Sequence, residues 1–222
     1  MLLLQLSILQ AQTYNRTLLV SFLPTFGSDG HLQLDTTYTY RDTANIRFEA
    51  FKCYLTNFKL LAKGQVVWTE SYSYHLLNAE VPSSMDIPLS VPADKQYDAL
   101  QFTVGIDSST NTAGIMEGDL DPTKGMYWTW QNGYINFKLE GTCSLSSAPK
   151  HQFQYHLGGY LQGLQTAHTV TVDIRRAPAC TIAIDLEKFL KKVDWSHQPL
   201  LMSPGPQAVD LSKVLSSTFQ VK

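Results

Sequence analysis

The stretch HTVTVDIRRAPACTIAIDL, residues 168–186, alternates apolar and polar side chains in two successive runs. Because successive side chains of a strand point to opposite faces, this spacing predicts two half-buried antiparallel strands. The apolar positions of the two runs are Val170, Val172 and Ile174, and then Cys180, Ile182, Ile184 and Leu186.

Similar runs recur along the rest of the chain. YINFKLE, residues 134–140, alternates in the same way. In NIRFEAFKCYL, residues 45–55, the apolar set changes face partway, which predicts a β-bulge near Ala50. Further strands are expected at Leu18–Leu23, Leu32–Thr37, Val66–Thr69, Ser71–Leu77, Met85–Leu89, Leu100–Ile106 and Phe153–Leu157.

Helical spacing is confined to the last part of the chain. DLEKFLKKV, residues 185–193, and PQAVDLSKVLSSTF, residues 206–219, repeat apolar residues at helical intervals, and Asp210 is a candidate cap for the second helix. About ten strands without strand–helix alternation predict an all-β fold, a single-domain antiparallel β-sandwich with one or two short helices. We expect that domain to occupy residues 12–222, since the sequence shows no linker and no internal repeat.

The composition narrows the function classes. Hydrophobic residues make up 44% of the chain and charged residues only 16%, which argues against disorder. The net charge of -2 provides no broad basic field, so we expect no nucleic-acid partner.

The first residues are apolar. MLLLQLSILQA, residues 1–11, is too short to span a bilayer and is typical of a truncated signal segment that ends near Ala11. An amphipathic or core segment is the alternative. We therefore expect an exported protein without a membrane span.

The three cysteines, Cys53, Cys143 and Cys180, form no CxxC pair, which argues against a cysteine zinc site. In an exported protein one disulfide plus one free thiol is an option. Three reduced, buried cysteines are the other option.

No catalytic motif stands out. The chain has no GxSxG, HExxH, P-loop or GxGxxG pattern, so we expect no enzyme. Asp107, Asp119 and Asp121 are candidate ligands for a hard cation such as calcium. Their spacing is not that of an EF-hand, and solvated loop acids are the simpler interpretation.

His75 and His156 stand in strand-like runs. In SYSYHLL, residues 71–77, His75 shares a face with two serines; in HQFQYHLGG, residues 151–159, His156 shares a face with two glutamines and precedes two glycines. Exposed histidines on polar strand faces are the simpler interpretation. A two-histidine metal site is the alternative, because ligands from separate strands leave no local signature.

The aromatic stretch DPTKGMYWTWQNGYINFKLEG, residues 121–141, also allows two interpretations. As one continuous strand it would place Trp128 and Trp130 on the polar face, near Met126. Indole and thioether groups of that kind would suit a soft ion such as Cu(I) or an apolar ligand. If Asn132-Gly133 is instead a hairpin turn, the alternation restarts and both indoles are expected in the core.

Several blocks resemble the MbnP-like family of copper-binding proteins, which includes the methanobactin-associated MbnP, CorA and MopE types. The resemblance extends from about Leu18 to Phe219. It is carried by GIDSSTNTAGIMEGDLDPTKGMYWTWQNGYINFKLEG, FQYHLGG, FKCYLTNFKLL, ESYSYHLLN and LMSPGPQAVDLSKV.

The resemblance implies a periplasmic, cell-surface or secreted β-sandwich without enzymatic activity. Its copper-binding members hold Cu(I) with two histidines from distant strands, here His75 and His156. A tryptophan oxidised to kynurenine completes their site, and a dihaem peroxidase-like partner of the MbnH type performs the oxidation.

This chain departs from the family at one position. The modified tryptophan is expected close before the first histidine, but Ser73 stands there and the nearest upstream indole is Trp68. Trp128, Trp130 and Met126 remain as additional ligand candidates.

We therefore expect an exported protein for copper acquisition, storage or delivery. The alternative is a metal-free binding module that uses its Tyr- and Trp-rich face for a glycan, a peptide or a protein partner. The oligomeric state is not predicted.

Overall fold

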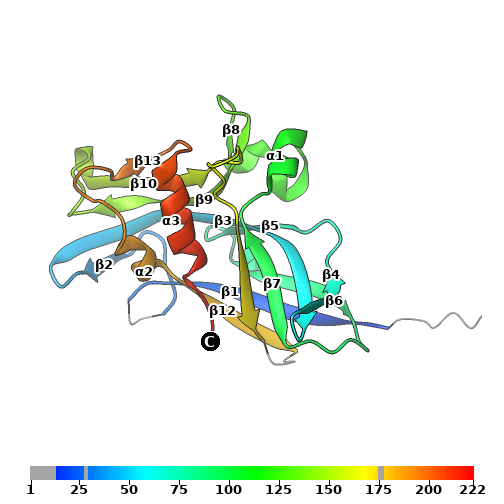
Figure 1. The fold of residues 1–222 in the computed structure, drawn as a ribbon. Helices are drawn as coiled ribbons and strands as arrows, with labels where there is room; N and C mark the ends of the chain where they lie inside the picture. Colours follow the sequence, from blue (N-terminus) through cyan, green and yellow to red (C-terminus); the bar gives the residue numbers. More distant parts are fainter. Residues whose placement is uncertain (1–13, 28–29, 175–177) are drawn as a thin grey trace, which may run out of the picture.

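The fold is a sandwich of two sheets, seen in a computed structural model that describes residues 14–27, 30–174 and 178–222. The expected signal segment, residues 1–11, lies outside the described residues. Figure 1 shows β1 and β12 below the β3–β9–β10 part of the larger sheet, with α3 across the front. None of the helices in these ranges is long and apolar enough to cross a bilayer.

The smaller sheet brings distant parts of the chain together. Its central pair, β1 and β12, runs parallel, whereas the outer pairs are antiparallel. The strand order is β14 (Phe219–Val221), β12 (Ala179–Asp185), β1 (Asn15–Thr25) and β6 (Asp86–Pro92).

The larger sheet is built around one long strand, β3 (Ala44–Ala62). On one edge β3 pairs with β9 and then β7, and on the other with β2, β5 and β4 in turn. The order is β11 (His168–Asp173), β7 (Ala99–Val104), β3, β9 (Gly133–Cys143), β10 (Gln152–Gly158) and β13 (Leu200–Leu201). The remaining strands are β2 (Thr37–Tyr40), β4 (Gln65–Thr69), β5 (Tyr74–Asn78) and β8 (Tyr127–Trp128).

The main core lies between the two sheets and is closed by α2 and α3. A second, smaller core lies on the outer face of the larger sheet, beneath β8 and the loops around α1. The helices are α1 (Ser108–Ala113), α2 (Leu186–Leu190) and α3 (Pro206–Ser216), with single turns η1 (Pro82–Met85), η2 (Gly118–Leu120), η3 (Pro122–Lys124) and η4 (Pro149–His151). The members of the small core are Tyr54, Leu76, Ile106, Leu120, Met126, Trp128, Tyr134 and Ile135.

The predicted all-β sandwich is confirmed, and so is the bulge near Ala50, where the β3–β9 register shifts. The strand predicted at Leu32–Thr37 is wrong. The N–H of Leu32 donates to the Pro24 carbonyl, and Asp35 has a positive φ of 61°, so this segment turns before β2 begins. Asp210 is not a cap, because α3 already begins at Pro206.

The three cysteines are free and buried, and burial raises the pKa of the Cys180 thiol to about 11. The interpretation as small hydrophobic residues therefore holds for this fold.

Candidate functional site

The two predicted metal-ligating histidines lie on opposite faces of the larger sheet. Residues directly opposite each other in neighbouring strands share a face. His75 is opposite Leu55 of β3, whose side chain is buried in the main core. His156 is opposite Lys138 of β9, which is opposite Lys52 of β3. Positions 52 and 55 of one regular strand point to opposite faces, so the two imidazoles do too.

Two strands, β3 and β9, also lie between β5 and β10. Three steps between neighbouring strands amount to about 14 Å. A metal ion binds imidazole nitrogen at about 2 Å. One ion therefore cannot be shared by His75 and His156 in this fold.

A carboxylate orients His75 at the edge of the main core. Its Nε2 lies 2.8 Å from Oε2 of Glu70, and its ring packs edge-on against Phe58 at a centroid distance of 5.3 Å. The side chain is 24% exposed and lines a cavity of about 230 Å³ together with Asp86 and Asp119.

Ser73, at the position where the resemblance places the modified tryptophan, has a structural role. Its hydroxyl accepts from the Phe58 N–H at 2.9 Å and donates to Glu70 at 2.6 Å. The serine thus fixes the carboxylate that orients His75. Trp68 lies on β4 opposite Leu60 and packs partly buried against the main core.

His156 is held in the same way on the outer face. Its Nε2 lies 2.5 Å from Oε1 of Glu140, and the residue is only 8% exposed. The hydrogen bond from His156 holds the pKa of the Glu140 carboxyl below its usual value. Burial lowers the pKa of the neighbouring Lys138, whose ammonium donates to the Gly125 carbonyl at 2.6 Å.

The aromatic stretch forms a hairpin, as the second interpretation predicts, but the turn occupies residues 129–132 and Gly133 is already paired in β9. Residues 127 and 128 of β8 pair with 134 and 133 of β9, and Asn132 has a positive φ of 51°. Trp128 is buried, but Trp130 is 64% exposed, with its ring 5.7 Å from that of Trp128. Met126 is fully buried in the small core.

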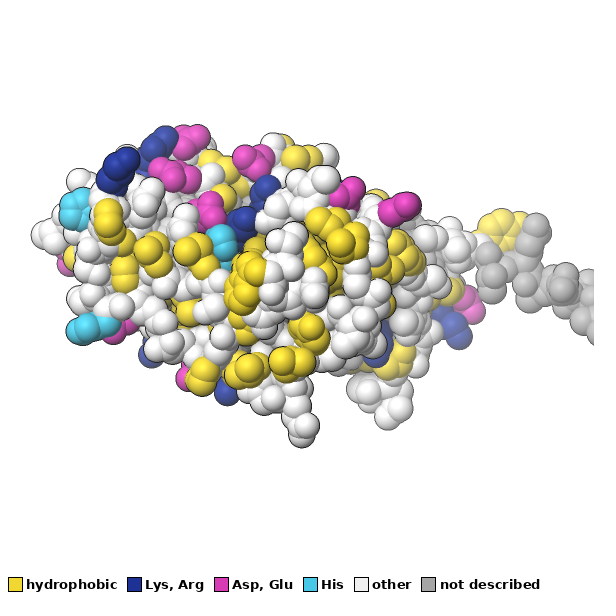
Figure 2. All heavy atoms as spheres, turned by 90° about the horizontal axis from the view of Figure 1, so that it is seen from above, with side chains coloured by type: hydrophobic (Ala, Val, Ile, Leu, Met, Phe, Trp, Pro, Cys, Tyr) yellow, Lys and Arg dark blue, Asp and Glu magenta, His cyan; other side chains and the backbone are white. Residues whose placement is uncertain are grey.

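Trp128 covers the end of β10. A Cβ built on Gly158 would meet Cζ3 of the Trp128 indole at 2.6 Å, so the ring lies directly over that glycine. The register of β10 with β9 shifts between Leu157 and Gly158, and Gly158 lies opposite Ile135 of the small core, so it faces the outer side of the sheet, as His156 does. Figure 2 shows this side of the molecule from above, where hydrophobic side chains lie among acidic and basic ones.

Both histidines keep one nitrogen available. Among the described residues, neither Nδ1 has a hydrogen-bond partner, whereas each Nε2 contacts a glutamate. Metal-ligating histidines are commonly oriented in this way, with the second ring nitrogen donating to a carboxylate. Sequence patterns did not identify Glu70 or Glu140 as these partners, although Glu140 already stood on the polar face of its predicted strand.

The predicted calcium ligands have separate structural roles. Asp107 accepts from the Thr110 N–H at the start of α1, and Asp121 accepts from the Thr123 N–H. Asp119 pairs with Lys124. In the part of the chain that the structure describes, no group of three or more His, Cys, Asp or Glu side chains is arranged to hold a metal ion.

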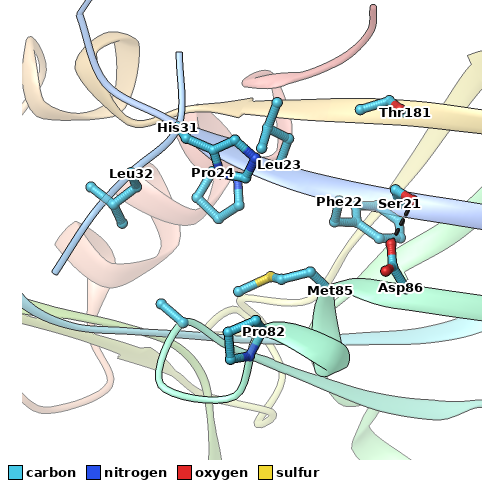
Figure 3. A pocket seen from close by; sticks show the side chains of 11 residues that line it. Ser21, Phe22, Leu23, Pro24, His31, Leu32, Pro82, Met85, Asp86 and Thr181 are labelled. Atoms are coloured by element: carbon cyan, nitrogen blue, oxygen red, sulfur yellow. Dashed lines mark hydrogen bonds between the residues drawn. The ribbon is translucent and has the colours of Figure 1, made fainter. Parts of the chain in front are cut away.

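A separate cavity of about 400 Å³ lies beside β1, where β6 begins (Figure 3). His31 and Met85 lie on opposite walls, and Ser21 donates to Asp86 at 2.6 Å at one end. The cavity is large enough for a small ligand, and none of the predicted site residues lines it.

Comparison with known proteins places the chain. A search of curated proteins finds no match. Among solved structures, MbnP from Methylosinus trichosporium is similar, with a TM-score of 0.60 and 17% sequence identity over 87% of this chain and 82% of that one. At this identity the likeness shows the fold. The family model of MbnP matches residues 15–203, and the chain therefore belongs to the MbnP family.

Proposed function

We propose that this protein is exported and binds Cu(I) for copper acquisition, storage or delivery. Family membership supports a copper-related function. The observation that carries the proposal is the pairing of each candidate histidine with a glutamate through Nε2, at 2.8 Å for His75 and 2.5 Å for His156. This pairing leaves Nδ1 of each imidazole ring available as a ligand.

The two histidines act independently in this proposal, because they lie on opposite faces of the sheet. His156 is the principal ligand. It is more buried than His75, it has the shorter contact to its glutamate, and the Trp128 indole covers Gly158 further along the same strand. Burial excludes competing water and strengthens the interactions of a metal ion with its ligands.

The family resemblance extends the proposal to oxidation of a tryptophan by a dihaem peroxidase-like partner. Trp130 is the candidate, since a partner protein needs an accessible indole and this one is 64% exposed beside Trp128. Intact-mass and peptide mass spectrometry of the protein coexpressed with such a partner tests this step. Four unmodified tryptophans would contradict it.

Metal analysis tests the main proposal. The full chain is loaded with Cu(I) without oxygen, desalted and compared with His156→Ala and His75→Ala. His197→Ala is the control, because that side chain is 86% exposed and belongs to neither of the two histidine–glutamate pairs. We expect His156→Ala to lose bound copper and the control to retain it. Equal copper in all four proteins would contradict the proposal.

A metal-free binding module is the second candidate. It is favoured by the large exposed side chains on and near the outer face, where Trp130, Ile115 and Tyr72 are each more than half exposed. Exposed aromatic rings are common contact points for glycans and proteins. Quenching of tryptophan fluorescence by a glycan or peptide panel in the presence of a metal chelator would support this function.

A further inference from the structure

A thioether side chain, that of Met202, follows the last paired residue of β13 at the edge of the larger sheet. β13 pairs in parallel with β10, with Leu200 opposite Gln154 and Leu201 opposite Tyr155. β13 ends at Leu201, and Met202 follows it directly, as His156 follows Tyr155 on β10. Pro204 then lies near Gly159, where its Cβ is 3.4 Å from a Cβ built on that glycine, so the two segments stay side by side.

The burial pattern places both side chains on the outer face. Leu201 and Tyr155 are buried in the main core, so the next residue of each segment points away from it. Met202 is 42% exposed, and His156 is 8% exposed. Neighbouring strands are about 4.8 Å apart, a distance at which two side chains can bind one ion between them.

The remaining neighbours of this pair suit a monovalent cation. Glu140 supplies negative charge and orients the imidazole through Nε2. Trp128 covers the strand at Gly158 and restricts water on that side. Lys138 is the nearby cationic group, and its ammonium is held by the Gly125 carbonyl of the loop before β8.

The donor set selects a soft metal. Thioether and imidazole are ligands of Cu(I), whereas zinc sites require three or four His, Cys or carboxylate ligands. The described residues contain no such larger cluster. We propose that Nδ1 of His156 and Sδ of Met202 form a two-coordinate Cu(I) site beneath the Trp128 indole; this inference rests on the proposed function and names its second ligand.

X-ray absorption of the Cu(I)-loaded full chain tests the sulfur ligand. We expect one sulfur scatterer in the wild-type protein and its loss in Met202→Leu. Met85→Leu is the matched control, since Met85 lines the separate cavity beside β1. Leu and Met have similar volumes, and Met202 is partly exposed, so the variant should fold.

Competition with the Cu(I) chelator bicinchoninate gives the second readout. We expect Met202→Leu to bind Cu(I) at least about tenfold more weakly than the wild-type protein and Met85→Leu to be unchanged. A wild-type spectrum with nitrogen and oxygen scatterers alone, or an unchanged affinity in Met202→Leu, overturns the inference. If His156→Ala still loses copper in that case, the proposed function stands. A wild-type protein that binds no copper overturns both.

Discussion

At the scale of single residues, the contact between Glu140 and His156 makes the stability of the fold depend on pH. The pKa of Glu140 is lowered in the fold, chiefly by the hydrogen bond from His156. A carboxyl with a lowered folded-state pKa stabilises the fold above its unfolded value, near 4.5, and this contribution is lost as pH falls through the folded value.

We therefore expect Glu140→Gln to reduce the free energy of unfolding at neutral pH by about 1–3 kcal/mol. The loss should shrink on acidification below the ordinary pKa of glutamate, because the wild-type protein then loses the same contribution. Urea denaturation at several pH values between about 7 and 3 measures the loss at neutral pH and its decrease on acidification. Glu117→Gln, at an exposed position, is the control. A constant difference at every pH would contradict this assignment.

Gly158 is required because the Trp128 indole occupies the space of a side chain. A Cβ there would meet the indole at 2.6 Å and the Tyr134 carbonyl oxygen at 2.7 Å. We expect Gly158→Ala to destabilise the protein by about 1–3 kcal/mol and to shift tryptophan fluorescence, since the ring must move. Gly205→Ala is the comparison, because no atom lies within 4 Å of its added Cβ. Equal denaturation midpoints for the two variants would contradict the packing.

The residues also show what a sequence can predict about a site. Alternation placed His75 and His156 on the less apolar side of their own strands. It carries no information about which face of the common sheet each side becomes. That depends on the register of both strands with β3 and β9, which are distant in the sequence. The glutamate partners and Met202 depend on the same long-range pairing.

At the scale of elements, the bulge and the hairpin differ in how well local sequence defines them. A change of apolar face within residues 45–55 requires an extra residue, so the bulge near Ala50 was predictable. The Asn132-Gly133 pair is a turn signal, but the sequence of residues 127–140 is also compatible with one continuous strand. The pairing of β8 with β9 shows that the stretch is a hairpin. Trp128 is buried in the small core, whereas Trp130 is exposed.

Asn136 of β9 connects this strand to two loop segments through one buried amide. Its oxygen accepts from the Ile106 N–H at 2.9 Å, and its nitrogen donates to Thr166 at 2.8 Å, while the residue is 2% exposed. We expect Asn136→Ala to cost about 2–4 kcal/mol, since it leaves buried polar groups without partners and opens a cavity. Chemical denaturation should show no comparable loss for the exposed Asn45→Ala. Similar denaturation midpoints for the two variants would mean that water molecules replace the hydrogen bonds of the Asn136 amide.

At the scale of the whole molecule, each sheet contains a parallel pairing that alternation could not reveal. The sequence indicated an antiparallel sandwich, yet β1 pairs in parallel with β12, and β10 with β13. Parallel partners need a long connection, so the partner of a strand is not its neighbour in sequence. The fold class was therefore predictable from the strands, but the strand order was not.

Phe219 of β14 is the point where this long-range order can be tested. Its ring lies 6.4 Å from that of Phe22 in the smaller sheet and 5.5 Å from that of Phe102 in the larger one. We expect Phe219→Ala to lower the free energy of unfolding by about 3–5 kcal/mol, because the ring is buried between the two sheets. Urea denaturation measures the loss, and the exposed neighbour Gln220→Ala should be nearly neutral.

The same variant separates the scaffold from the proposed site. Phe219 packs between the sheets, whereas His156 lies on the outer face of the larger sheet. In conditions where Phe219→Ala remains folded, its Cu(I) affinity should equal that of the wild-type protein. Weaker copper binding by the folded variant would mean that the outer face is not rigid. Changes in the packing of the main core would then shift the His156 imidazole through β10.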